Sequence, residues 1–130
     1  MSYENPLSMT YVFPSLNFAT TPAASAIRPP AGYKRGNVRD IQVAVTTLFT
    51  QTTTPAFVRL GTVGDDDKYA ELNMGAAAAT DAYNLSNTGH KPKVIDLEAD
   101  GISQVEVTFI APTGGSPAGA GTVTVHMEWF

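Results

Sequence analysis

Hydrophobic and polar positions alternate through much of the chain after residue 38. Ile41, Val43 and Val45 are separated by polar or small residues, and the same two-residue period runs through 102–110 and 123–129. Because successive side chains of a β-strand point to opposite faces, this period predicts strands that each bury one face. Shorter apolar runs at 57–60, 69–72 and 94–97 predict further strands.

Turn-forming residues separate these predicted strands. Residues 63–67 are expected to join 57–60 to 69–72 as a hairpin, Asp100 and Gly101 form a turn pair, and 112–121 is a loop rich in Gly, Pro and Ala. Helix propensity is high only at 75–79, which is too short for a stable helix and predicts a loop or single turn. The sequence therefore predicts an all-β fold, an antiparallel β-sandwich, and the long crossing at 75–93 favours a jelly-roll-like topology.

The first thirty residues differ from the rest because they hold five of the nine prolines: Pro6, Pro14, Pro22, Pro29 and Pro30. Proline fixes φ and disfavours helix at the preceding residue, so this segment is predicted to be extended. We expect a strand over 10–18 that is broken at Pro14. Residues 1–37 are interpreted as an N-terminal arm, packed on its own domain or on a neighbour, and residues 38–130 as the sandwich. Deleting 1–30 should then leave a folded β domain.

Composition favours a protein that works through its surface. The chain has 130 residues, enough for one core, and 15% of them are charged, where soluble proteins average about 25%. A sparsely charged surface loses less hydration when it docks against a partner. The net charge of -4 argues against nucleic-acid binding.

One basic group stands apart from this acidic background. Arg28, Lys34, Arg35 and Arg39 fall within twelve positions and no acidic residue interrupts them. They are either a solvated basic turn or a group that meets an acidic neighbour.

Signals for covalent stabilisation, export and membrane insertion are missing from the sequence. It has no cysteine, the residues after Met1 lack the basic start and apolar run of a secretory signal, and no stretch approaches about 18 apolar residues. We expect synthesis in a cytoplasm, no disulfide, no cofactor and no membrane partner.

Candidate chemistry is sparse. His90 and His126 are the only histidines, and no serine occupies a G-x-S-x-G motif, so enzymatic activity is not expected. Asp65, Asp66 and Asp67 suggest either a turn or a calcium site, but calcium loops space their ligands at alternate positions.

Aromatic residues leave a sugar-binding alternative open. Tyr33, Tyr69, Tyr83 and Trp129 are candidate stacking platforms, and the competing interpretation is packing. Trp129 shares the apolar phase of the last predicted strand, which favours a place in the core or a subunit interface.

Three segments together resemble a known class of protein: RDIQVAVTTLFT at 39–50, FVRLGTVGDDDKYAELNMG at 57–75, and DLEADGISQVEVTFIAPTGGSPAGAGTVTVHMEWF at 96–130. They resemble small structural proteins of tailed bacteriophages, of the type that decorates or cements the capsid. The resemblance covers about half of the chain, and no motif in it is diagnostic alone.

This resemblance implies a non-enzymatic virion protein on the outer capsid surface. It implies a homotrimer that binds between major capsid subunits and stabilises the shell. We expect Tyr11, Phe13 and Phe18 to anchor the arm on a partner, and Arg28, Lys34, Arg35 and Arg39 to form a polar docking group. The alternative is a carbohydrate-binding or adhesion β-sandwich module, for example in a head fibre or tail component.

Overall fold

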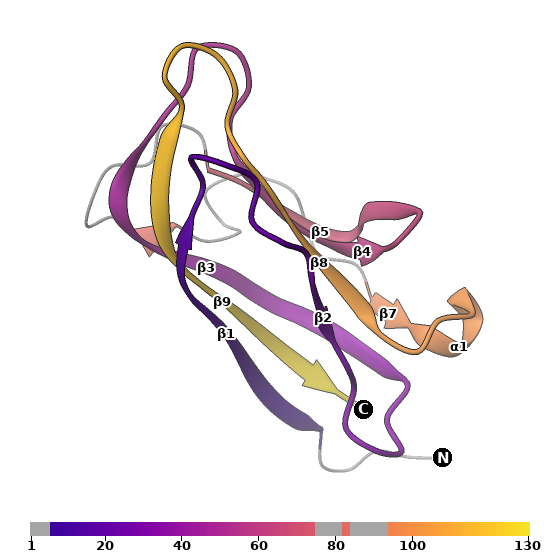
Figure 1. Ribbon diagram of the computed structural model, residues 1–130. Helices are drawn as coiled ribbons and strands as arrows, with labels where there is room; N and C mark the ends of the chain where they lie inside the picture. The colour runs from indigo at the N-terminus through magenta and orange to yellow at the C-terminus, as the bar shows by residue number, and fades with distance from the viewer. Residues whose placement is uncertain (1–5, 75–81, 84–93) are drawn as a thin grey trace.

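A computed structural model describes residues 6–74, 82–83 and 94–130, and within them the chain forms two antiparallel sheets (Figure 1). One sheet has the order β1-β9-β3-β6, with β7 also paired to β3, and the other has the order β2-β8-β4-β5. The strands are β1 Leu7–Asn17, β2 Ser25–Ile27, β3 Arg35–Thr50, β4 Phe57–Thr62, β5 Asp65–Asn73, β6 Ala82–Tyr83, β7 Val94–Asp96, β8 Val105–Ile110 and β9 Ala118–Trp129. The predicted all-β sandwich is confirmed, whereas a jelly-roll topology stays a prediction.

The two longest strands, β3 and β9, pair at the centre of the five-stranded sheet. Their register runs from Gly36 opposite Trp129 to Thr50 opposite Ala118. Every second residue of β9 is buried, as the alternation predicted. The strand begins inside the predicted 112–121 loop because its small residues permit close packing: a Cβ on Gly119 would lie 2.6 Å from Cε2 of Phe49.

The core fills the space between the sheets with side chains from both. Phe18 packs against Phe49 and Phe109, with ring centroids 5.2 and 6.2 Å apart. Trp129 is fully buried, and its Nε1 donates a hydrogen bond of 2.9 Å to the hydroxyl of Tyr11. The single tryptophan therefore belongs to the core, one of the two places expected for it.

The N-terminal segment is part of both sheets. β1 pairs with β9, and it continues through Pro14, with a register shift between Phe13 and Leu16. The predicted break at Pro14 is thus an irregularity inside one strand, where Ser15 has a φ of 53°. The boundary drawn between 37 and 38 falls inside β3. Deleting residues 1–30 would remove β1, β2 and two core side chains, Phe18 and Ile27.

Two local predictions need correction. The turn expected at 63–67 is shorter, because β5 already begins at Asp65. The strand expected over 94–97 ends at Asp96, whose side chain accepts the N–H of Ala99 at 3.1 Å and starts the four-residue helix α1, Leu97–Asp100. Gly101, with a φ of 68°, ends this helix.

Some predictions fall on residues that the structure leaves undescribed: the turn at 75–79, His90, and most of the 75–93 crossing. In the described ranges, no helix is long and apolar enough to cross a membrane.

Candidate partner-docking surface

Among the described strands, β1 forms the longest uncharged edge of a sheet. This strand ends the five-stranded sheet, and no described strand pairs with its outer side. It carries no charged residue, and Leu7 and Val12 are 38% and 55% exposed. The other described edges are short or charged, since β2 has three residues and β5 begins with three aspartates. Uncharged free edges can accept an added strand through backbone hydrogen bonds.

The three predicted arm anchors have different places around this edge. Tyr11 and Phe13 are partly buried and point toward the core, where Phe13 meets Phe109 edge-on at a centroid distance of 5.5 Å. The hydroxyl of Tyr11 accepts from Trp129 and donates to Sδ of Met9. Phe18 is fully buried, so its side chain packs the core and has no surface to offer a partner.

The predicted basic docking group acquires acidic neighbours in the folded chain. Arg35 lies 3.3 Å from a carboxylate oxygen of Asp96, and Arg39 lies 3.8 Å from one of Glu128. Both arginine side chains remain about 60% exposed. The positive charge of Arg35 and Arg39 is therefore balanced locally by acidic residues of β7 and β9, although no acidic residue interrupts the basic group along the sequence.

The remaining two members of the basic group lie beside loops. Arg28 donates to Oε1 of Gln104 at 3.1 Å. Lys34 is exposed, and its backbone carbonyl accepts the N–H of Leu97, the first residue of α1. All four residues remain available at the surface, and a docking role for them stays a prediction.

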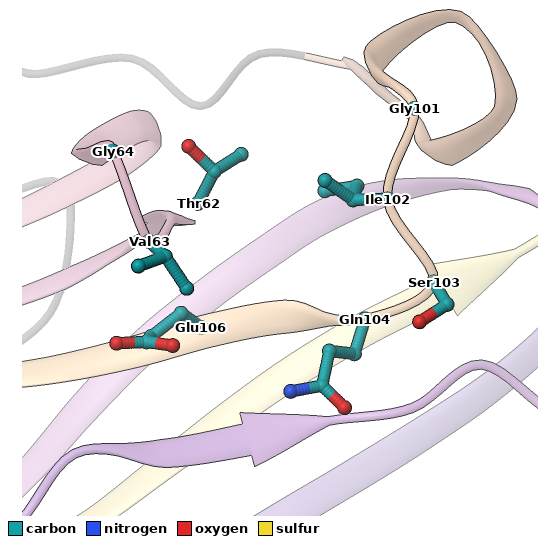
Figure 2. Close-up of a pocket in the computed structure, with 8 residues that line it drawn as sticks. All are labelled: Thr62, Val63, Gly64, Gly101, Ile102, Ser103, Gln104 and Glu106. Atoms are coloured by element: carbon teal, nitrogen blue, oxygen red, sulfur yellow. The ribbon is translucent and has the colours of Figure 1, made fainter.

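An open cleft of about 530 Å³ lies between the β4–β5 turn and the segment that leads into β8 (Figure 2). Thr62, Val63 and Gly64 form one side, and Gly101 to Gln104 with Glu106 form the other. Val63 is 85% exposed, and Glu106 contributes the only charged group of the lining. The lining mixes apolar and uncharged polar side chains with one carboxylate, which is too little to define a catalytic constellation.

Beside this cleft, Tyr69, Lys68 and Asp100 form a polar cluster. The Tyr69 hydroxyl donates to Asp100, and Nζ of Lys68 lies 3.2 Å from the same carboxylate. Burial, together with the hydrogen bond and the negative charge of Asp100, raises the pKa of Tyr69 above its ordinary value. The hydrogen bond from Tyr69 and the nearby Lys68 lower the pKa of Asp100. The cluster links β5 to α1 and leaves both groups in their usual ionisation states near neutral pH.

The three consecutive aspartates do not converge on a common point. Asp66 pairs with Arg59 at 3.4 Å, and all three lie along β5 rather than in a turn. Across the described residues, no group of three or more His, Asp or Glu side chains is placed to hold a metal ion.

His126 takes part in a polar chain on the outer face of the five-stranded sheet. Its Nδ1 lies 3.3 Å from Oγ1 of Thr10, and its Nε2 lies 2.9 Å from Oε1 of Gln42. The connectivity resembles that of a nucleophile, base and orienting amide. All three groups lie on a strand face, however, and none lines the cleft of Figure 2.

The described aromatic rings give little support to sugar stacking. Tyr69 and Trp129 are buried, and Tyr11 and Tyr33 pack partly buried against the core. The side chain of Tyr83 lies outside the described part of the chain.

Comparison with known proteins bears on the fold. No protein-family model matches the chain, and no curated protein matches it. Among solved structures, a chain of the cyanophage Pam1 capsid asymmetric unit superposes with a TM-score of 0.54 at 15% sequence identity. The superposition covers 100% of this chain and 89% of that one. The two proteins therefore share a fold over nearly their whole lengths.

Proposed function

We propose that this chain is a non-enzymatic structural protein of a virion, and that it decorates or cements a capsid by binding between major capsid subunits. The observation that carries the proposal is the end-to-end fold match with a chain of a phage capsid asymmetric unit. The resemblance of three segments to phage decoration proteins agrees with it. A capsid partner and a homotrimeric assembly are parts of the proposal.

The free edge of β1 is the proposed contact with the shell. An uncharged strand adds to a neighbouring sheet without burying an unpaired charge. Tyr11 and Phe13 pack beneath this edge against the core. Arg35 and Arg39 supply exposed polar contacts. Rotational symmetry would multiply weak contacts, so that the assembled subunits bind with higher avidity than one copy.

Shell binding tests the function directly. Purified chain is added to shells prepared without it, and co-sedimentation measures the bound fraction. We expect saturable binding and a higher temperature of shell disruption. Absence of binding to such shells would overturn the proposal.

A substitution on β1 tests the proposed contact. Val12→Lys places a charge on the exposed edge strand and should weaken shell binding about tenfold, equivalent to about 1.4 kcal/mol. Val94→Lys is the matched control, because Val94 is 62% exposed on β7, another edge strand. Equal binding by the two variants would rule out the β1 edge as the contact while leaving a shell-binding protein.

A further inference from the structure

Charged residues are segregated along the sequence and, within the part of the chain that the structure describes, in space. Three long segments, 5–27, 41–58 and 107–125, contain no Asp, Glu, Lys or Arg. Each of them includes a loop at the same end of the sandwich, at 18–24, 51–56 and 111–117. We call these three loops the uncharged end. α1, the β4–β5 turn and the C-terminus lie at the opposite end (Figure 1).

Backbone hydrogen bonds join the three loops into one unit. Phe18 N–H donates to the carbonyl of Gly119 at 2.8 Å, and Thr53 N–H donates to the carbonyl of Thr113 at 3.0 Å. Ala111 N–H donates to the hydroxyl of Thr21 at 3.3 Å. The uncharged end is therefore a built surface whose parts hold one another in place.

A glycine permits the close approach of the 51–56 and 111–117 loops. Gly114 has a φ of 93°, and a Cβ there would lie 2.6 Å from the backbone nitrogen of Thr53. The 51–56 and 111–117 loops consequently run together as a projection, visible at the top of Figure 1.

The uncharged end presents small polar and apolar groups to solvent. Its exposed residues include Thr20, Thr52, Thr53 and Ser116. Leu48, just before the 51–56 loop, is 46% exposed. A groove of about 290 Å³ adjoins the loops, and it too has no charged residue; its lining is Ser15, Leu16, Asn17, Thr46, Thr47, Ala118, Gly119, Ala120 and Thr122.

The absence of charge favours one kind of occupant. Where copies of a chain meet around a rotation axis, residues near the axis face their own copies, so any charge there would meet a like charge. A different protein could instead present opposite charges. The chain has a net charge of -4, so two copies repel through their charged regions and approach most easily where charge is missing.

We infer that the uncharged end is the surface through which copies of this chain contact one another around a symmetry axis. The inference rests on the proposed function for its setting in a virion. It adds to that function the partner of this surface, which is a second copy of the chain. It leaves the free β1 edge for the shell.

The test introduces charge at Ser116, an exposed loop residue of the uncharged end, and measures mass in solution. Light scattering and sedimentation over a concentration series should give the wild type a mass that is a multiple of 13.7 kDa. Ser116→Lys and Ser116→Glu should each raise the dissociation constant at least about tenfold, because either charge meets its own copy. An equimolar mixture of the two variants should regain association.

Val63→Lys and Val63→Glu are the matched controls, because Val63 is an exposed loop residue at the opposite end. They should leave the mass unchanged, and far-ultraviolet circular dichroism should show all four variants folded. A monomeric wild type would overturn the inference, as would a response to only one sign of charge at Ser116 or an equal effect at Val63.

The inference and the proposed function can fail separately. A monomer that binds shells would leave the proposed shell-binding role standing, and would remove the self-contact together with the homotrimer. An oligomer that dissociates with charge at Ser116 but never binds shells would do the reverse.

Discussion

The hydrogen bond between Trp129 and Tyr11 gives a sharp prediction, because it joins a core residue to a candidate docking residue. Trp129 has no exposed surface, and its indole nitrogen donates to the Tyr11 hydroxyl at 2.9 Å. Tyr11→Phe removes the acceptor and leaves the ring in place. The buried N–H then has no partner, and water cannot easily replace the lost group.

The expected cost follows from that unsatisfied donor. Leaving a buried polar group without its partner costs about 1–3 kcal/mol, whereas the aromatic packing of Tyr11 is retained in phenylalanine. Domains of this size have a free energy of unfolding of about 5–15 kcal/mol, so a loss of this size should be readily measured. If the hydroxyl of Tyr11 served docking alone, the free energy of unfolding would stay unchanged.

A double-mutant cycle isolates the interaction. Urea unfolding is followed by far-ultraviolet circular dichroism for wild type, Tyr11→Phe, Trp129→Phe and the double variant, and also by fluorescence where the single tryptophan remains. With Trp129 replaced, Tyr11→Phe should cost little, because the partly buried hydroxyl no longer has a donor to satisfy. A cost for Tyr11→Phe that is the same in both backgrounds would refute the reasoning.

Two further predictions concern the β4–β5 hairpin and the cluster beside it. Gly61→Ala should lower the free energy of unfolding by about 1–3 kcal/mol, because its Cβ would lie 2.6 Å from the backbone carbon of Asp66, while Gly64→Ala, with nothing within 4 Å, should be nearly neutral. Urea unfolding of both variants measures this, and similar losses at the two glycines would contradict it. Because the pKa of Tyr69 is raised, the folded state holds the phenolic proton more tightly than the unfolded state. The protonated Tyr69 therefore contributes its full stabilisation below about pH 10, and this stabilisation is lost as pH rises above that value. Tyr69→Phe should flatten the fall of stability measured between pH 9 and 11, and an unchanged slope would count against the assignment.

The surroundings of two groups of candidate docking residues could not be predicted from the sequence. The basic residues from 28 to 39 have no acidic neighbour along the chain, but Asp96 and Glu128 reach Arg35 and Arg39 through strand pairing. Phe18 was expected to anchor the arm on a partner, and in the folded chain it packs against Phe49 and Phe109. Both outcomes depend on contacts between residues far apart in sequence, which periodicity cannot supply.

The sequence alone determined the all-β class, because the two-residue alternation in β3, β8 and β9 suits only strands with one buried face. It also determined the scarcity of charge. Tertiary structure decided that residues 7–17 form an edge strand against β9, since strand partners are chosen by packing between distant segments. It also brought three uncharged segments together at one end, a neighbourhood that chain order cannot show because only folding places those loops side by side.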